Sequence, residues 1–487
     1  MQKTSLKSAA VKGVLWSAVD KFAGQMGQFI VSIVLGRLLM PEDFGLIGML
    51  AIFIALSQTF IESGLGMGLV QKQERTALDF STVFVFNLLI SVLFYFVLFV
   101  MAPYIAVFFR QPQLVDLTRV LGLSLFINAL AIIQRTNLTI AMDFQSIAKS
   151  NLFGVALGGL AGVLFALNGY GVWSLIVQML IGSVTTAIAL WFYGKWKLSL
   201  IFSKKSFQKL FGYGSNLLVA SLYTQTLNNI YNICIGLYYS TTSLGYYTRA
   251  KTFADISAGT IGTVLQQATF PVFSSIQTDK QRLVSIFGRV IKMAAFLNIP
   301  LMTFIALLAK PIVVLLLTEK WMALIPMLQW MMFARVFLPM SAINMNVLNA
   351  VGRSDLFLKV DLSKLPITLL ALVITIPIGV KAMIIGHVIT AAISFAINAY
   401  LPGKLYGYGL GRQLKDMFPV LIATIGMVLI IVVILATIDD LALQLVLSGF
   451  LGLFAYLGIC RMLKIEELNE FLELLLKLKV KVMGTQK

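Results

Sequence analysis

Long apolar windows recur along this 487-residue chain, and no other feature of the sequence restricts its fold as strongly. Each window is close to the roughly 20 residues that an α-helix needs to cross the hydrocarbon core of a bilayer. Hydrophobic residues make up 59% of the chain and charged residues only 12%, well below the share that soluble domains carry. A single soluble core cannot bury that much apolar surface. The sequence therefore predicts an all-α polytopic membrane protein.

Division of the apolar windows predicts about fourteen transmembrane helices. The predicted spans are 13–38, 44–70, 80–108, 114–141, 146–167, 170–193, 207–237, 244–274, 283–309, 322–350, 356–377, 381–401, 416–437 and 441–462. The segment 311–317 is too short to cross alone, so we expect it to end the ninth helix or to lie at the interface. An even number of crossings places both termini on the same side of the membrane.

Lysine and arginine are unevenly distributed among the predicted loops. They gather at the N-terminus, in every second loop and in the tail, which marks that side as cytoplasmic. The densest group lies between the sixth and seventh predicted helices and comprises Lys195, Lys197, Lys204, Lys205 and Lys209. We therefore assign the net charge of +18 to membrane topology. We expect no nucleic-acid partner, because no nucleic-acid-binding motif is present.

The two halves of the chain resemble each other at an offset of about 200 residues. GRLLMPEDFG at 36–45 aligns with GLYYSTTSLG at 236–245, and both follow the first helix of their half. Parallel repeats of this kind are a known transporter architecture. The predicted division has two six-helix bundles, N-terminal at 1–193 and C-terminal at 207–401, joined by a basic cytoplasmic linker at 194–206. Two additional transmembrane helices follow at 402–463. An amphipathic cytoplasmic tail at 464–487 ends the chain, and we expect it at the membrane surface.

Polar residues form a stripe along the first helix of each half. Lys21, Gln25, Gln28 and Ser32 share one helical face, and Gln225, Asn228 and Asn232 occupy the positions of the seventh helix that match 25, 28 and 32. A stripe that faces lipid costs free energy, so it should face protein or water. We predict that Gln25, Gln28, Gln225, Asn228 and Asn232 line a hydrated cleft between the bundles. Hydrogen bonding between helices without a cleft is the alternative.

Charged residues inside the predicted spans need a partner or a purpose. A charge at the bilayer centre costs about 2.5–3.5 kcal/mol on insertion scales. A cationic, water-filled cavity would suit a pyrophosphate or an acidic sugar. The cations predicted to form this cavity are Lys21, Arg135, Arg249, Lys251, Lys292 and Arg335. The acids predicted to couple transport to an ion are Asp20, Glu62 and Asp255. For each of these groups, structural pairing is the alternative.

Catalytic and cofactor-binding motifs are missing from the sequence. There is no phosphate-binding GxxxxGK[ST] loop, no HExxH and no GxSxG. Cys234, Cys460 and the lone His387 are too few for a structural zinc site. We therefore expect a transporter with no catalytic residue, no metal and no bound cofactor.

Four short segments resemble one protein family. They are KGVLWS at 12–17, LGRLLMPEDFG at 35–45, LGYYTRAK at 244–251 and TFPVFS at 269–274. The chain is similar, over roughly residues 5–460, to Wzx-type polysaccharide repeat-unit flippases. These belong to the multidrug/oligosaccharidyl-lipid/polysaccharide exporter superfamily.

This resemblance implies a function that the residue patterns alone do not give. The implied substrate is an undecaprenyl-pyrophosphate-linked oligosaccharide repeat unit for O-antigen, capsule or exopolysaccharide. It would cross the bacterial inner membrane by alternating access, driven by H⁺ or Na⁺. A polysaccharide polymerase and chain-length machinery are possible partners. The alternatives are a lipid II flippase, a multidrug or cation antiporter, and a membrane-embedded polymerase or transferase, which would usually carry a long periplasmic loop.

Overall fold

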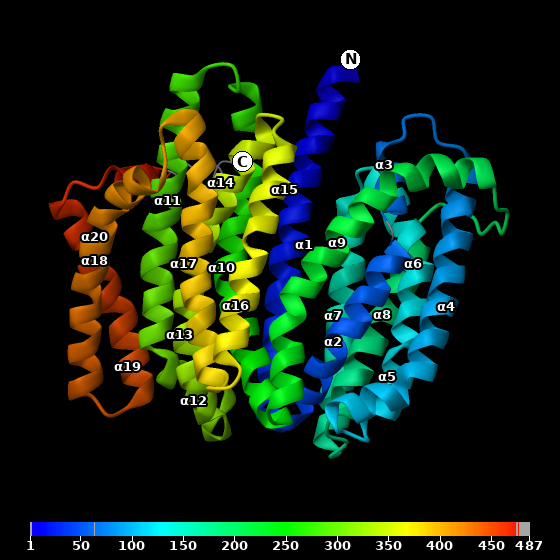
Figure 1. The fold of residues 1–487 in the computed structure, drawn as a ribbon, viewed down its shortest axis with the longest axis horizontal. Helices are drawn as coiled ribbons and strands as arrows, with labels where there is room; N and C mark the ends of the chain where they lie inside the picture. Colours follow the sequence, from blue (N-terminus) through cyan, green and yellow to red (C-terminus); the bar gives the residue numbers. More distant parts are fainter. Residues whose placement is uncertain (1, 63, 474–475, 477–487) are drawn as a thin grey trace, which may run out of the picture. The chain divides into compact units, whose positions relative to one another are not determined.

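The computed structural model describes residues 2–62, 64–473 and 476, and all regular secondary structure among them is helical (Figure 1). This confirms the predicted all-α class. The chain forms two compact units, Met1–Thr248 and Arg249–Lys487. The division predicted from the sequence repeat follows a different criterion and stays a prediction.

The first unit contains ten helices in whole or in part within its described residues. They are α1 (Gln2–Leu38), α2 (Pro41–Glu62), α3 (Leu65–Gln71), α4 (Ala77–Phe109), α5 (Leu114–Leu121), α6 (Leu123–Ile140), α7 (Phe144–Leu167), α8 (Trp173–Tyr193), α9 (Lys204–Tyr238) and the start of α10 (Thr241–Ser275). In this unit α7 packs against both α1 and α8, and α2 packs against α9.

The second unit continues from within α10. Its further helices are α11 (Lys280–Leu307), α12 (Ala309–Leu317), the 3-10 helix η1 (Glu319–Leu324), α13 (Ile325–Arg335), α14 (Leu338–Ala350), α15 (Ser354–Ser363), α16 (Leu365–Thr375), α17 (Val380–Tyr406), α18 (Leu410–Thr437), α19 (Leu441–Leu447), the π-helical η2 (Ser448–Gly452) and α20 (Leu453–Met462). Here α11 packs against α13 and α18, and α17 packs against α13, α14 and α16.

Ten helices of the described chain are long and apolar enough to cross a membrane. Each of them coincides with a predicted span, which confirms a polytopic membrane protein. The other four predicted spans are helical too: they correspond to α1, α9, α10 and the pair α15–α16. These four are not among the ten helices of the described chain that length and composition identify as candidate spans. The count of fourteen crossings stays a prediction.

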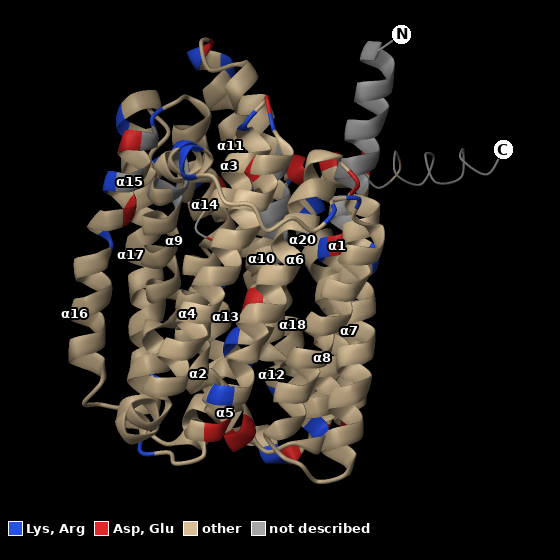
Figure 2. Ribbon diagram, turned by 90° about the vertical axis from the view of Figure 1, so that its right-hand side faces the viewer, with Lys and Arg blue, Asp and Glu red and all other residues tan. Residues whose placement is uncertain are grey.

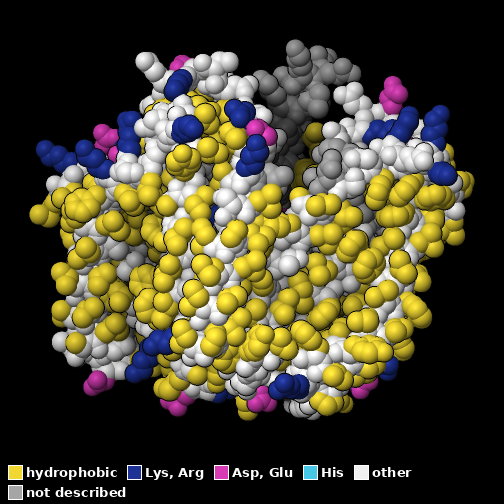
Figure 3. Space-filling view, in the orientation of Figure 1, with side chains coloured by type: hydrophobic (Ala, Val, Ile, Leu, Met, Phe, Trp, Pro, Cys, Tyr) yellow, Lys and Arg dark blue, Asp and Glu magenta, His cyan; other side chains and the backbone are white. Residues whose placement is uncertain are grey.

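Charged and hydrophobic side chains lie at different positions along the helices. Figure 2 shows that Lys, Arg, Asp and Glu lie mostly near helix ends, with few at mid-length. Figure 3 shows hydrophobic side chains over the middle of the helices that face the viewer. This distribution suits helices whose middle sections lie in hydrocarbon and whose ends reach water.

Side-chain caps fix where several helices begin. Thr76 and Asp79 form a capping box at the start of α4, in which each side chain accepts a hydrogen bond from the other's backbone N–H. Ser203 caps α9, and Asp279 caps α11. Such caps satisfy backbone donors that have no partner inside the helix. The cap residues therefore define the helix starts at the end of the molecule predicted to be cytoplasmic.

Two segments aligned by the sequence repeat touch each other within the first unit. A Cβ atom on Gly45 would lie 1.9 Å from the Thr241 carbonyl oxygen, and one on Gly245 would lie 1.8 Å from the Pro41 carbonyl oxygen. The contact is reciprocal, because positions 41 and 45 meet 245 and 241 at the repeat offset of 200. Only glycine allows the first turns of α2 and α10 to approach this closely.

The tail after α20 packs on the protein itself. Residues 466–473 are helical, and Ile465 and Leu468 are buried. The ring of Phe471 lies 6.1 Å from that of Phe296 on α11. The described part of the tail therefore places apolar side chains against α11. Its predicted position at the membrane surface stays a prediction. Residues 474–475 and 477–487 of the predicted tail lie outside the described residues.

Ion pairs hold the same contact. Lys292 Nζ lies 2.9 Å from Glu467 Oε1, and Arg289 Nε lies 2.5 Å from Glu470 Oε1. Glu467 is nearly fully buried, with 6% of its side chain exposed. A buried carboxylate needs a paired cation, so Lys292 has a structural partner within its own unit.

Exchanging the charges of Lys292 and Glu467 tests this tail contact. Lys292→Glu places two carboxylates together, and we expect it to destabilise the docked tail by about 1 kcal/mol because the lysine is partly exposed. Limited proteolysis should then cut the tail several-fold faster, and K292E combined with E467K should restore resistance. A tail that is cut at the same rate in all three proteins would contradict the contact.

Candidate functional site

Arg335 is the centre of a charged cluster inside the second unit. Its Nε and Nη2 atoms lie 2.8 and 2.7 Å from Asp255 Oδ1, and its Nη1 lies 3.0 Å from His387 Nε2. These three residues come from α13, α10 and α17, all within predicted spans. The sequence pattern offered no local partner for Arg335, and the partners lie on other helices.

The arrangement defines the protonation state of His387. A guanidinium group only donates hydrogen bonds, so His387 Nε2 must accept and the ring proton lies on Nδ1. A neutral imidazole beside a cation avoids placing two positive charges together in a medium of low polarity. The lone His387 was not predicted as a site residue, because a single histidine cannot form a metal site or an acid/base pair. The one sequence feature that could have indicated it is that Arg335, inside a predicted span, needs a polar neighbour.

Accessibility differs across this cluster. The Asp255 side chain is 44% exposed, whereas the Arg335 side chain is 14% exposed. The carboxylate therefore reaches the surface of the unit while the guanidinium stays largely buried. Lys251 lies one turn before Asp255 on α10 and interacts electrostatically with both Asp255 and Arg335. Arg249, two positions earlier, is buried with 7% exposed.

A second cluster lies in the first unit, where Asn151 connects two predicted site residues. Asn151 Nδ2 donates to Asp20 Oδ1 at 2.9 Å, and its Oδ1 accepts from Arg135 Nη2 at 2.9 Å. The three residues belong to α7, α1 and α6. The amide thus joins an acid and a cation that are 115 positions apart in sequence (135 minus 20). No pattern along the chain pointed to Asn151.

Glu62 on α2 belongs to the same region. It accepts a hydrogen bond from Gln58 Nε2 at 3.2 Å, and Gln58 Oε1 accepts from Asn128 on α6 at 3.3 Å. The charges of Glu62 and Asp20 both act on Arg135. The structure therefore brings together the predicted acids Asp20 and Glu62 and the predicted cation Arg135.

The remaining predicted residues are distributed along α1 and α9. The side chains of Lys21, Gln25, Gln28 and Asn228 are exposed, and Gln225 is half-buried. Asn232 is buried, and its Nδ2 lies 3.5 Å from Asn229 Oδ1. Asn232 therefore forms part of the interior of the first unit. The assignment of these residues to a cleft stays a prediction.

Each unit thus holds a group of acidic and cationic side chains at helix positions predicted to lie in the membrane, with amides in the first unit and an imidazole in the second. An exposed guanidinium or ammonium group can bind a phosphate, and a carboxylate paired with it can exchange a proton or a metal cation. Among the residues that the structure describes, no three His, Cys, Asp or Glu side chains gather as metal ligands would. Binding of an anionic group by the cations of these clusters stays a prediction.

Comparison with known proteins gives several relatives. The model of one family, described as "Polysaccharide biosynthesis protein", matches residues 34–326. The teichuronic acid biosynthesis protein TuaB of Bacillus subtilis is 22% identical over 87% of this chain and 88% of its own length. The lipopolysaccharide biosynthesis protein WzxC of Escherichia coli is 22% identical over 76% of each chain. The succinoglycan biosynthesis transport protein ExoT of Rhizobium meliloti is 23% identical over 72% of each chain.

Solved structures show the same fold. The lipid II flippase MurJ in its inward closed conformation superposes with a TM-score of 0.75, with 14% identity over 92% of this chain and 98% of its own. An inward-facing multidrug resistance MATE family transporter of the MOP superfamily gives a TM-score of 0.63, with 18% identity over 80% of this chain and 97% of its own. At these identities the likeness concerns the fold.

Proposed function

Because this chain belongs to the polysaccharide biosynthesis protein family, we propose that it is a flippase for undecaprenyl-pyrophosphate-linked oligosaccharide repeat units. The family match and the relatives confirm the resemblance to Wzx-type flippases. The fold is that of MOP-superfamily transporters. The protein would carry its substrate across the bacterial inner membrane by alternating access, with both termini in the cytoplasm.

The observation that carries this proposal is an excess of positive charge inside the predicted spans. Lys292 pairs with Glu467 of the tail, so it is not counted among the cations available to a substrate. Against the acids Asp20, Glu62 and Asp255 stand the cations Lys21, Arg135, Arg249, Lys251 and Arg335. A pyrophosphate group carries negative charge, and its oxygens accept the charge-assisted hydrogen bonds that guanidinium and ammonium groups donate.

Different residues would serve binding and coupling. Lys21 and Arg135 have exposed side chains in the first unit, so their charged groups can reach a pyrophosphate. In the second unit, Asp255 competes with a substrate anion for Arg335. Binding of H⁺ or Na⁺ at the half-exposed Asp255 carboxylate would weaken its hold on Arg335 and free the guanidinium for the anion. This linkage would couple an ion gradient to substrate binding.

The pool of lipid-linked oligosaccharides in a deletion strain tests the function. We expect undecaprenyl-pyrophosphate-linked repeat units to accumulate on the cytoplasmic face while surface polymer is lost. The native chain should restore export, and Lys21→Ala combined with Arg135→Ala should restore at most about a tenth of it, since two charge-assisted bonds are lost. A normal pool and normal surface polymer, in a strain without a redundant flippase, would contradict the proposal.

Lipid II transport is the second candidate, favoured by the likeness to a lipid II flippase over 92% of this chain. Depletion separates the two functions. Loss of a sole lipid II flippase should cause lysis, whereas loss of a surface-polysaccharide flippase should leave viable cells. Drug-susceptibility tests on the same strain distinguish drug export, which the fold likeness to a MATE transporter also allows.

A further inference from the structure

The segment between α8 and α9 exposes an unusual combination of side chains. Residues 194–203 have no regular secondary structure. Their large apolar side chains are 45–67% exposed and comprise Leu198, Leu200, Ile201 and Phe202. Exposed lysines are interleaved with them and continue into α9, namely Lys195, Lys197, Lys204, Lys205 and Lys209. We refer to residues 194–209 as the basic strip.

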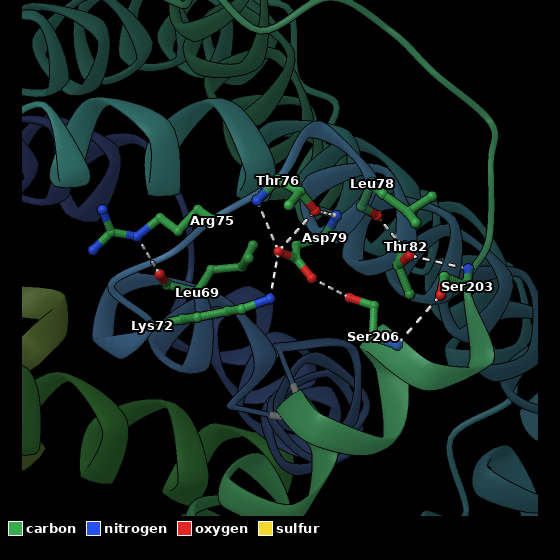
Figure 4. Close-up of polar contacts among 9 residues, drawn as sticks. All are labelled: Leu69, Lys72, Arg75, Thr76, Leu78, Asp79, Thr82, Ser203 and Ser206. Atoms are coloured by element: carbon green, nitrogen blue, oxygen red, sulfur yellow. Dashed lines mark hydrogen bonds and ion pairs between the residues drawn. The ribbon is translucent and has the colours of Figure 1, made fainter.

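Hydrogen bonds hold the basic strip on the first unit. Figure 4 shows Ser206 Oγ donating to the buried Asp79 carboxylate, which also lies 2.6 Å from Lys72 Nζ. The Ser203 backbone N–H donates to Thr82 Oγ1 at 3.1 Å. These bonds attach the start of α9 to the start of α4.

The other end of the strip is fastened as well. Gln134 Nε2 donates to the Trp196 carbonyl oxygen at 2.9 Å, and the Trp196 ring lies 5.3 Å from that of Phe84. Trp196, Ser199 and Ser203 are half-buried. With both ends fixed, the apolar and lysine side chains between them are presented outward as a preformed surface.

The position of the strip explains what this surface would contact. It connects the last residue of α8 with the first residue of α9, two helices that coincide with predicted spans, so it lies where hydrocarbon gives way to headgroups. Leucine, isoleucine and phenylalanine side chains insert at the acyl boundary, while lysines extend to the headgroups. Residues 194–209 contain no acid, and their lysines form no ion pair with any described residue.

We propose that the basic strip binds the phosphate headgroups of anionic phospholipids in the leaflet predicted to be cytoplasmic. Five unpaired lysines around an exposed apolar core match an anionic lipid in both charge and polarity. Because the strip is tied to α4 and α6 on the first unit, bound lipid would hold this end of the unit at the interface. This inference is independent of the substrate that the protein carries.

Lipid selectivity of the full-length protein tests the proposal. The protein is reconstituted in phosphatidylcholine vesicles with and without about 30% phosphatidylglycerol, an anionic lipid. Spin-labelled phosphatidylglycerol reports binding at the protein surface. We expect several-fold preference over spin-labelled phosphatidylcholine, a preference that about 1 M NaCl reduces. Lys204→Gln with Lys205→Gln should lower the preference at least about twofold.

Lys280→Gln with Arg282→Gln is the matched control. Both pairs are exposed cations in the first turn of a capped helix, but the six residues directly before α11, 274–279, present no exposed apolar side chain. The control should leave the preference unchanged, and all variants should elute as the native protein in gel filtration. Equal effects of the two pairs would overturn the proposal.

A depth measurement gives a second, independent test. A spin label is attached at Leu200→Cys in a protein with Cys234→Ala and Cys460→Ala, and its access to oxygen and to an aqueous relaxant is compared. In vesicles with phosphatidylglycerol, we expect the label to gain oxygen access and lose contact with the aqueous relaxant. A label that stays in water in both vesicle types would also overturn the proposal.

Discussion

Gly45→Ala should reduce export at least about fivefold, although the substitution adds only one methyl group. The new Cβ atom would lie 1.9 Å from the Thr241 carbonyl oxygen, so the first turns of α2 and α10 must separate. Overpacking of this kind costs about 1–3 kcal/mol, which corresponds to a shift of about five- to 150-fold in the population of the close-packed state. If transport requires the close-packed state, export should fall by the same factor as the population of that state.

A disulfide measurement detects the separation directly. Thr242 Oγ1 donates to Glu42 Oε1 at 2.9 Å, so Glu42→Cys and Thr242→Cys should cross-link efficiently in a protein with no other cysteine. Gly45→Ala should lower the cross-linking yield. Gly245→Ala should act equally, because the contact is reciprocal and its Cβ would lie 1.8 Å from the Pro41 oxygen.

Gly259→Ala on α10 is the control for these substitutions. No atom lies within 4 Å of a Cβ built at Gly259, so the alanine should be tolerated there. It also raises helix propensity to the same degree as the test substitutions. Normal cross-linking and normal export in Gly45→Ala would show that the close approach is not required.

Arg335→Ala is expected to have the second large effect, a loss of about a hundredfold in export. The substitution removes both bonds to Asp255 and the bond to His387, and it leaves a carboxylate without its hydrogen-bonded cation inside a predicted span. Such a charge costs about 2.5–3.5 kcal/mol on insertion scales, less the relief that its partial exposure gives. We therefore expect a lower protein level together with lost transport.

A second substitution separates folding from function. Arg335→Ala with Asp255→Asn removes the uncompensated charge, so the protein level should recover while export stays low. Arg353→Ala is the control, because its pair with Asp355 at 3.1 Å is half-exposed and should matter little. Recovery of export in the double variant would show that the pair is structural and has no role in transport.

Local patterns were enough to predict much of this protein. Hydropathy and helical periodicity are properties of neighbouring residues, so they predicted the all-α class and ten segments that coincide with helices long and apolar enough to cross a membrane. The repeated glycines at 45 and 245 were visible as an alignment. Their direct contact was not, because alignment shows equivalence and gives no information on proximity.

The partners of the intramembrane charges were decided by tertiary structure alone. Asp255 and His387 lie 80 and 52 positions from Arg335, and Asn151 lies 131 positions from Asp20. Lys292, predicted in a cavity, pairs with the tail. A charge in a medium of low polarity is stabilised by whichever opposite or polar group the packed helices bring within about 3 Å. Sequence shows that such a partner is needed, and only the packing of the helices determines which residue it is.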